Sequence, residues 1–363
     1  SNTLCRAMPL PSPMHRVYVG EALGLSGAAA GEPGAASVLA PGARIVLEGP
    51  EATHLVRVKR LGEGDLIGLF DGRGTTAVGC IQGTGRAEEH AREGEGRGGG
   101  SGGKEEGGGR RRKGGKGGKG GRGSARAVEV LINEARHVPA LRPRLEICTA
   151  VPKGGAGGRL DEMVDQLSQA AAAAVSPMVC ARSVVEPREG GHKMERLRRI
   201  CVESAKQCAR PWLMEIGNVV KFEEALAAPA GTVVLLADEQ AGQDAVPIVG
   251  RGSAIQGSGL LAPVENLADV VAAWAEQARA VAQGKSGTHE AEAWRGGVGP
   301  AAVRVLIGPE GGWEDQERAR ALAAGAKRVG LGPLVMRIET AAVAAAVMIM
   351  AHARAGHPGA TGG

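Results

Sequence analysis

A pair of glycine-containing segments near the C-terminus constrains this chain more than any other feature of its sequence. The segments are Leu306–Trp313 (LIGPEGGW) and Leu331–Ala341 (LGPLVMRIETA), and each lies between a short apolar run and a helical pattern. A segment of this kind is typical of a loop at the carboxyl end of a parallel strand, where open α/β sheets bind ligands. Two such loops can together form one pocket for one small molecule.

From about residue 144 onward, strand and helix patterns alternate, which is typical of an α/β domain. Strands are predicted at Leu145–Val151, Thr232–Ala237 and Val303–Ile307. Apolar stripes at helical spacing predict three helices: Leu160, Met163, Val164, Leu167 and Ala171; Met194, Leu197, Cys201, Ala205 and Cys208; and Val264, Leu267, Val271, Trp274 and Ala278. A last helix, about Glu339–Ala353, is apolar on nearly every face, so we expect it in a core or in a subunit interface.

The N-terminal part shows short alternating strands, which indicate a small β-barrel. These strands are expected at Arg16–Val19, Ala43–Leu47, Leu66–Phe70 and Ala127–Ile132. Asp71-Gly72 is a hairpin turn signal, and a short helix is predicted over Glu51–Leu61.

Residues 85–125 interrupt the predicted barrel with Gly, Arg, Lys and Glu, a composition that cannot bury enough apolar surface to fold. Between residues 86 and 126 lie 12 of the 44 basic and 6 of the 39 acidic residues, which leaves 32 basic and 33 acidic residues elsewhere. The folded parts are therefore close to neutral, and any surface for nucleic acid on them must be a local patch. We expect a disordered insertion, either merely solvated or acting as a non-specific RNA-gripping arm.

The cysteine and apolar patterns limit the classes of site that this chain can carry. The six cysteines are Cys5, Cys80, Cys148, Cys180, Cys201 and Cys208, and none forms a CxxC pair. They indicate small buried hydrophobic side chains, a reducing compartment and no zinc site. His54 has no partner at metal-ligand spacing, and no apolar run reaches the length of a transmembrane helix.

The glycine segments favour one kind of ligand over another. Pro309 and Gly311-Gly312 let main-chain groups approach a ligand closely. Because neither phosphate-binding spacing, GxGxxG or GxxxxGK[ST], occurs there, a diphosphate cradle is not indicated. Main-chain groups beside apolar residues suit an adenine and a ribose better.

These segments, Ile307–Gly312 and Leu331–Ala341, resemble the two signature segments of the RsmE family. That family comprises SPOUT-class methyltransferases that modify N3 of a uridine in 16S ribosomal RNA. The resemblance extends upstream through His54–Arg60 and Gly64-Asp65, then Pro152–Gly154, Arg159, Pro177, Arg182-Ser183, Glu203, Gln207, Arg210 and Glu215. It implies an α/β protein with a PUA-like RNA-binding β-barrel over 15–142 and a SPOUT methyltransferase domain with a deep trefoil knot over 143–355. Residues 240–262 and 283–300 are then flexible loops.

The resemblance also implies an S-adenosylmethionine site, with no metal. Its expected residues are Leu236, Ile307, Gly308, Pro309, Glu310, Gly311, Gly312, Leu331, Gly332, Leu334, Met336 and Arg337. As catalytic residues we expect Arg337, which would stabilise the uridine anion or else bridge loop carbonyls and Glu339, and Glu310, which would accept a proton or cap the next helix. The residues expected to contact RNA are Arg16, His54, Arg57, Arg60, Lys153, Arg159, Arg182 and Arg210.

Several positions depart from the family pattern. The family usually has Arg at Leu334 and Thr at Ile338, and it usually has a Lys and a Glu-Leu-Gly at Gln166 and Gln169–Ala171. Two alternatives stay open. One is methylation of another RNA site, such as a ribose 2′-hydroxyl, against which the PUA-like barrel and the Arg337–Thr340 signature argue. The other is an RNA-binding protein without turnover, which the loss of charge at Leu334 keeps open.

The expected partner is small-subunit ribosomal RNA, free or in an assembled particle, which would bind between the barrel and the SPOUT domain. A homodimer is also expected, and no membrane partner. The Gly, Ala and Arg bias resembles that of nuclear genes in GC-rich algae, so we expect a chloroplast location. A mitochondrion or a bacterial-type cytoplasm is the alternative.

Overall fold

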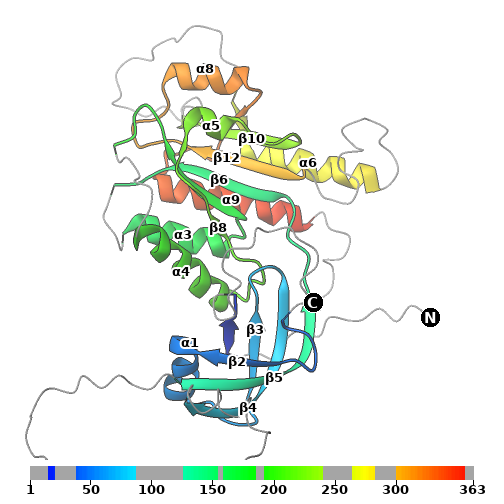
Figure 1. Ribbon diagram of the computed structural model, residues 1–363. Coiled ribbons are helices and arrows are strands. Elements are labelled where there is room, and N and C mark those ends of the chain that lie inside the picture. The colour runs from blue at the N-terminus through cyan, green and yellow to red at the C-terminus, as the bar shows by residue number, and fades with distance from the viewer. Residues whose placement is uncertain are drawn as a thin grey trace, which may run out of the picture. The chain divides into compact units, whose positions relative to one another are not determined.

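The computed structural model describes residues 15–20, 38–86, 126–153, 158–184, 192–239, 264–282 and 300–355. It divides into two compact units, Ser1–Val138 and Pro139–Gly363, and each is described by itself (Figure 1). The insertion predicted at 85–125 lies outside the described residues from 87 onward. The loop predicted over 240–262 also lies outside them, as does the loop predicted over 283–300 except for residue 300.

The N-terminal unit is built on a five-stranded sheet in the order β1-β3-β4-β5-β2. Its strands are β1 (Arg16–Tyr18), β2 (Arg44–Glu48), β3 (Leu66–Phe70), β4 (Thr75–Arg86) and β5 (Arg126–His137). The pairings are antiparallel except that of β1 with β3. Alternate strand residues such as Ile45, Leu47 and Val130 point into one buried core, as the period-two pattern predicts.

The turn between β3 and β4 confirms the hairpin predicted at Asp71-Gly72. The Asp71 carboxylate accepts hydrogen bonds from the main-chain N–H of Arg73 at 2.7 Å and of Thr75 at 2.9 Å. Gly72 and Gly74 both have positive φ, 73° and 101°, which this turn requires. At the other end of β4, Arg86 is paired with Arg126, so the insertion joins two neighbouring strand ends.

The helix predicted over Glu51–Leu61 ends earlier, at Val58, and changes from an α-helix to a π-helix along its length. A helix α1 (Gly49–Thr53) continues as a π-helical turn η1 (His54–Val58). Arg60 then adopts a left-handed conformation with φ 57°, beyond the end of the helix. Arg57 is therefore helical, whereas Arg60 lies outside the helix that was predicted to include it.

The C-terminal unit contains the predicted parallel sheet, in the order β11-β13-β10-β12-β6-β7-β8, with β9 also paired to β7. Its strands are β6 (Arg144–Ala150), β7 (Ala174–Val179), β8 (Glu215–Ile216), β9 (Val220–Lys221), β10 (Thr232–Ala237), β11 (Glu265–Asn266), β12 (Ala302–Ile307) and β13 (Lys327–Gly330). All of these pairings are parallel. The alternation of strand and helix in the sequence is thus confirmed.

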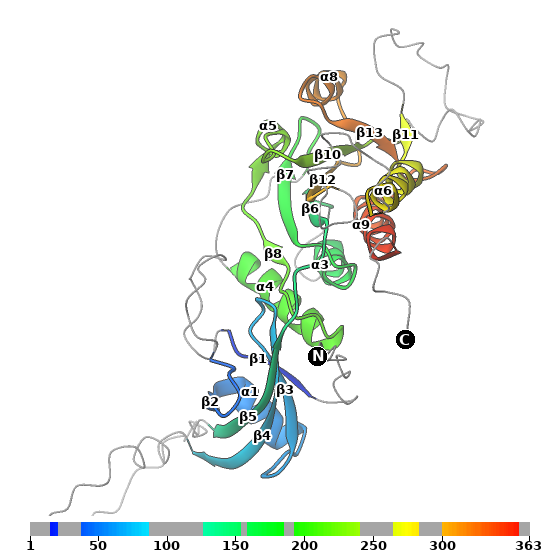
Figure 2. The same ribbon diagram turned by 90° about the vertical axis from the view of Figure 1, so that its right-hand side faces the viewer.

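The helices among the described residues of this unit are α3 (Arg159–Gln169), α4 (His192–Gln207), α5 (Phe222–Leu226), α6 (Leu267–Ala282), α8 (Asp315–Ala323) and α9 (Ile338–Ala355). Two views show α3, α6 and α9 together on one side of the sheet and α5 on the other (Figures 1 and 2). The stripe residues within α3 are buried as expected, and in α4 Leu197, Cys201 and Ala205 are buried whereas Met194 is half-buried. Three stripe residues lie outside their helices, since Ala171 follows α3, Cys208 follows α4 and Val264 precedes α6.

Helix α9 packs against α3, α6, β6 and β12, so one side of it belongs to the core. It buries Ala342, Ala345 and Ala346 completely, whereas Val347 is 51% exposed. The core placement is therefore confirmed for that side, while a subunit interface on the other side stays a prediction. Within the described ranges, none of the helices has the length and apolar character needed to cross a membrane.

Candidate functional site

Three strand ends meet at one edge of the C-terminal sheet. Ala237, the last residue of β10, is paired with Ile307 of β12 on one side and with Val329 of β13 on the other. The first glycine loop follows Ile307 and the second follows Gly330. Because neighbouring parallel strands end at the same edge of a sheet, the two loops lie beside each other although a helix and a strand separate them in the sequence.

The two loops enclose a pocket of about 280 Å³, close to the lower end of the roughly 300–1,000 Å³ typical of small-molecule sites. Its lining residues are Ala237, Asp238, Glu239, Ile307, Gly308, Pro309, Glu310, Gly312, Trp313, Leu331, Gly332, Leu334, Val335, Met336, Arg337, Ile338 and Ala341. The structure therefore brings both sequence segments to one cavity.

Among the residues predicted to bind the cofactor, Leu236 and Gly311 do not line this pocket, whereas the others do. Leu236 is fully buried in the core of the unit. At Gly311 the direction that a Cβ would take leads to the side chain of Arg182, 3.4 Å away. Gly311 thus faces outward from the loop.

Sequence reasoning missed the end of β10 and the residue after the first loop. Asp238 and Glu239 line the pocket because they directly follow β10, and Trp313 lines it from the loop's far end. The strand-end rule that located both glycine loops applies equally to β10, and it could have identified Asp238. The family resemblance instead indicated Leu236, which lies two residues before Asp238.

The first loop is packed around Trp313. The indole Nε1–H donates to the main-chain oxygen of Ala237 at 2.7 Å, and the ring packs against Phe222 with centroids 5.3 Å apart. A Cβ at Gly308 would lie 2.8 Å from the indole, so only glycine fits there. Gly312 closes the turn by donating to Pro309 O at 2.9 Å, with φ 70°.

The helix after this loop, α8, begins at Asp315, and its N-cap is Glu314 rather than Glu310. Glu314 is the N-cap of α8, and its main-chain N–H donates to the carboxylate of Glu317 at 2.9 Å. Glu310 instead accepts a weak hydrogen bond from the main-chain N–H of Lys153 at 3.4 Å. The capping role considered for Glu310 is therefore wrong, and its carboxylate lines the pocket. Gly325, with φ 83°, directly follows the C-cap Ala324 of this helix.

In the second loop, Arg337 is the one cation among the described residues that line the pocket. Its main-chain oxygen accepts the N–H of Ala341 at 2.8 Å, so it stands at the start of α9. Glu339 pairs with Arg159 at 3.5 Å rather than with Arg337. Within the part of the chain that the structure describes, the Arg337 guanidinium makes no hydrogen bond or ion pair, and the side chain is exposed. The structural role considered for Arg337 thus lacks its expected partner.

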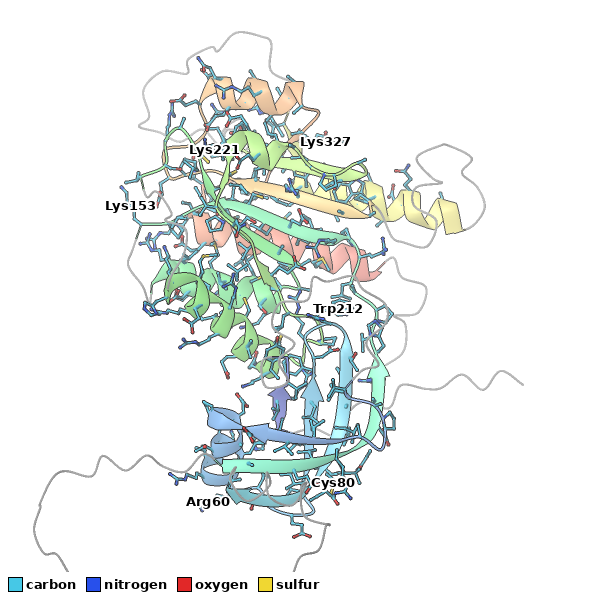
Figure 3. The ribbon with its side chains drawn as sticks, viewed as in Figure 1. Arg60, Cys80, Lys153, Trp212, Lys221 and Lys327 are labelled. Atoms are coloured by element: carbon cyan, nitrogen blue, oxygen red, sulfur yellow. The ribbon has the colours of Figure 1, made fainter. Side chains whose placement is uncertain are left out.

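Four residues predicted to contact RNA belong to the N-terminal unit. His54, Arg57 and Arg60 are exposed in and after η1, and Figure 3 labels Arg60 beside that helix. Arg16 is half-buried, with its guanidinium 4.8 Å from the centre of the Phe70 ring. Neighbouring His15 has a pKa lowered by partial burial and by the nearby positive charges of Lys59 and His54. This part of the unit is a local basic patch. A patch of this kind is what we expect of a nucleic-acid surface on folded parts that are near neutral overall.

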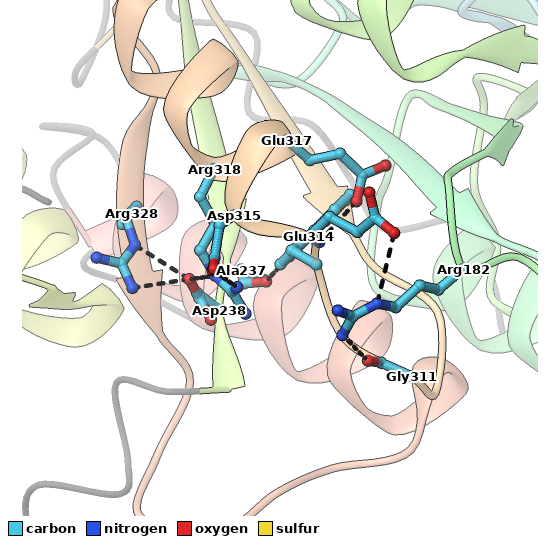
Figure 4. A network of polar contacts seen from close by, with 10 residues as sticks. Arg182, Ala237, Asp238, Gly311, Glu314, Asp315, Glu317, Arg318 and Arg328 are labelled. Atoms are coloured by element: carbon cyan, nitrogen blue, oxygen red, sulfur yellow. Dashed lines mark hydrogen bonds and ion pairs between the residues drawn. The ribbon is translucent and has the colours of Figure 1, made fainter. Parts of the chain in front are cut away.

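The other four belong to the C-terminal unit and mostly bind the protein itself. Arg182 donates to Gly311 O at 2.9 Å and lies 3.8 Å from the carboxylate of Glu314 (Figure 4). Arg159 pairs with Glu339, and the exposed Lys153 lies near the pocket through its main-chain contact with Glu310. These three are still available at the surface.

Arg210 differs, because its guanidinium holds the end of α3. It donates to Ser168 O at 2.8 Å and to Ala172 O at 2.6 Å. Burial lowers the pKa of this guanidinium. The prediction that Arg210 contacts RNA does not fit this placement, since its donors satisfy carbonyls left open at a helix end.

Three of the cysteines in the described residues, Cys148, Cys180 and Cys201, are buried. Burial raises the pKa of Cys148 to about 11 and the pKa values of Cys180 and Cys201 to about 12. A thiol with such a pKa stays protonated at neutral pH. No group of three or more His, Cys, Asp or Glu side chains within the described ranges is arranged to hold a metal.

Comparison with known proteins defines the class. A family model described as RNA methyltransferase domain matches residues 140–256 and 253–350, and one described as RNA methyltransferase PUA domain matches residues 47–92. The chain therefore belongs to the RNA methyltransferase family. Its N-terminal unit is PUA-like and its C-terminal unit is a SPOUT-like α/β domain.

Within this family the chain is similar to ribosomal RNA small subunit methyltransferase E of Synechocystis sp., with 24% identity over 229 residues. The match covers 63% of this chain and 59% of that relative's length.

Two solved structures share the fold. The first is a putative methyltransferase from Legionella pneumophila with bound SAM, at 19% identity and a TM-score of 0.52, covering 93% of this chain and 97% of the other. The second is ribosomal RNA small subunit methyltransferase E from Neisseria gonorrhoeae bound to S-adenosyl methionine, at 17% identity and a TM-score of 0.52, with the same coverage. At these identities the likeness concerns the fold.

Proposed function

We propose that the protein is an S-adenosylmethionine-dependent methyltransferase that forms 3-methyluridine in small-subunit (16S) ribosomal RNA. The observation that carries this proposal is the pocket shared by the two glycine loops, in a chain that belongs to the RNA methyltransferase family. The similarity to a small-subunit methyltransferase supports the choice of RNA, and two structural relatives hold this cofactor.

The pocket residues fit the cofactor. Apolar side chains of Ile307, Leu331 and Met336 offer surfaces for an adenine, and the glycines of both loops leave main-chain groups accessible beside them. The carboxylates of Glu239 and Glu310 also line the pocket and can accept hydrogen bonds from hydroxyl or ammonium groups. When bound, S-adenosylmethionine supplies a methyl group already activated by its positively charged sulfur.

Arg337 and Glu310 then share the chemistry at the uridine. N3 of uridine carries a proton at neutral pH, and its lone pair attacks only as this proton leaves. The Arg337 guanidinium stabilises the negative charge that develops on O2 and O4 of the base. Glu310 accepts the proton or orients the base. Attack by N3 needs no covalent adduct with the enzyme, which is consistent with the protonated, buried cysteines.

The finer features of the proposal concern assembly and place. A homodimer is supported by the exposed apolar residues Leu334, Val335 and Val347, which are 67%, 51% and 51% exposed around the pocket and on α9. A deep trefoil knot through the second loop is supported by the resemblance to the RsmE family. The RNA contacts the basic patch of the PUA-like unit and the surface arginines near the pocket. Its substrate form is either free ribosomal RNA or the RNA within an assembled small subunit. A chloroplast location is supported by composition alone.

Methyl transfer to small-subunit particles tests the function directly. The purified protein is incubated with unmodified particles and tritiated S-adenosylmethionine, and the RNA is then digested to nucleosides. The proposal predicts tritium in 3-methyluridine. Label in a 2′-O-methyl nucleoside indicates methylation of another site. Cofactor binding without labelled RNA indicates an RNA-binding protein without turnover, the alternative that Leu334 favours.

A further inference from the structure

A buried cluster of charged side chains lies directly beside the pocket. The carboxylate oxygen Oδ2 of Asp238 accepts hydrogen bonds from Nε of Arg318 at 2.9 Å and from Nε of Arg328 at 3.0 Å, and Nη2 of Arg328 lies 2.9 Å away (Figure 4). The side chains are 0%, 4% and 5% exposed respectively. These three residues are the Asp238 cluster.

Each member of the Asp238 cluster comes from an element that shapes the pocket. Asp238 follows β10 and lines the pocket itself. Arg318 lies in α8, directly after the first glycine loop, and Arg328 lies in β13, directly before the second. One carboxylate therefore joins the segments that carry both loops.

Two hydrogen bonds to main-chain oxygens join the same segments at the same place. The N–H of Asp238 donates to Val329 O at 2.9 Å, and the Trp313 indole donates to Ala237 O at 2.7 Å. The second loop is thereby fixed to β10 from the side of β13, and the first loop from the side of Trp313. Any change in the direction of the Asp238 carboxylate would shift both loops relative to each other.

Stability alone does not account for these charges. Buried ion pairs can often be replaced by apolar residues of similar volume with little or no loss of stability, because burial of the charges costs about as much as their attraction returns. What apolar side chains cannot supply is direction, since each hydrogen bond fixes a donor and an acceptor within a few tenths of an ångström. Sites that bind between two loops depend on such fixed geometry.

We propose that the Asp238 cluster is a positioning site that holds the two glycine loops at the separation that the methyl donor requires. This inference rests on the proposed cofactor site. Its three side chains act through the loops and not on the reacting atoms.

A charge-free variant separates positioning from stability. In Asp238→Leu/Arg318→Met/Arg328→Met the cluster is replaced by apolar side chains, and the matched control is Glu146→Leu/Arg304→Met. The control removes a pair joined at 2.8 Å between β6 and β12, with exposures of 20% and 15%. Thermal unfolding, the Kd for S-adenosylmethionine, and KM and kcat for methyl transfer are measured for the unaltered protein and both variants.

We expect the cluster variant to bind S-adenosylmethionine about tenfold more weakly or worse, a change of about 1.4 kcal/mol, at an unfolding temperature close to that of the control. The KM for the cofactor should rise while kcat at saturation changes little, because Arg337 and Glu310 are intact. Equal Kd values in the cluster variant and the unaltered protein would overturn the inference. Failure of the unaltered protein to bind the cofactor would instead refute the proposed function, and the inference with it.

A conservative variant covers the case in which the charge-free variant does not fold. Arg328→Lys keeps a charge beside Asp238 but loses one of the two donors that face the carboxylate. We expect unchanged thermal unfolding with a Kd raised about threefold. A Kd equal to that of the unaltered protein would contradict a positioning role.

Discussion

Gly308 shows how a single hydrogen atom determines the shape of the first loop. Its α-carbon lies against the face of Trp313, and a Cβ there would approach the indole to 2.8 Å. The indole cannot move aside, because its N–H is bonded to Ala237 O at 2.7 Å and its ring is packed on Phe222. Glycine is thus required at this position for the contact with Trp313. That contact affects the ligand only through the shape it gives to the first loop.

We predict that Gly308→Ala destabilises the C-terminal unit by about 1–3 kcal/mol, the usual cost of overpacking, and weakens cofactor binding. Thermal unfolding and titration with S-adenosylmethionine measure the two effects. Gly83→Ala is the matched control, since no atom lies within 4 Å of its Cβ position, and it should change stability by less than about 0.5 kcal/mol. Equal stability of the two variants would contradict the packing described for Trp313.

Arg337 is the residue at which binding and turnover should separate. We predict that Arg337→Ala lowers the rate of methyl transfer by about a hundredfold or more, as removal of a donor to a developing negative charge does elsewhere. The Kd for S-adenosylmethionine should change far less, because the main chain of the loop is held by other contacts. Single-turnover rates and direct titration give the two numbers. Equal losses in both would identify Arg337 as a structural residue.

At the scale of whole elements, the sequence predicted what depends on local pattern. Strand β10 was predicted at its observed bounds, Thr232–Ala237, and β12 within one residue. Both are apolar runs that end in a polar or glycine-containing segment. The change of winding at His54–Val58 was missed, because no residue type marks a π-helical turn.

The Asp238 cluster could not be predicted from the sequence at all. Its partners are separated by 80 and 90 residues along the chain. Only the order β13-β10-β12 places them together, and that order follows from the fold of the whole unit. The pocket itself was predictable to the extent that it consists of strand ends, and this covers both glycine loops and the end of β10 that Asp238 follows.

Strands β6 and β12 are joined by an ion pair whose contribution depends on pH. Burial raises the pKa of Glu146, but hydrogen bonds from Arg304 and Arg144 outweigh that effect, so the pKa lies below its usual value of 4.5. A carboxyl group with a lower pKa in the folded state stabilises the fold above its unfolded pKa. This contribution is lost as pH falls through the folded pKa.

We therefore predict that Glu146→Gln lowers the free energy of unfolding by about 1–3 kcal/mol at neutral pH, and that the difference from the unaltered protein shrinks below about pH 4.5. Denaturant unfolding across pH 3–7 measures it. Glu203→Gln serves as the control, since Glu203 is 71% exposed in its pair with Lys206 and should matter by less than about 1 kcal/mol. A pH-independent difference for Glu146→Gln would refute this assignment.

At the scale of the whole molecule, the segment between Arg86 and Arg126 is the feature that the folded units do not require. The two residues are paired neighbours on β4 and β5, so a short turn can replace residues 87–125. We predict that this deletion leaves thermal unfolding and cofactor binding unchanged. If the segment is only solvated, the affinity for small-subunit RNA and its dependence on salt also stay the same. Weaker binding with a shallower salt dependence would instead identify an RNA-gripping arm.

The central claim is that main-chain groups of both glycine loops hold one molecule of S-adenosylmethionine. Amide hydrogen exchange, measured with and without saturating cofactor, tests this claim most directly because it reports on each loop separately. We predict slower exchange in residues 307–313 and 331–338 together, and little change in the N-terminal unit. Protection of one loop alone, or unchanged exchange in both at millimolar cofactor, would contradict the account.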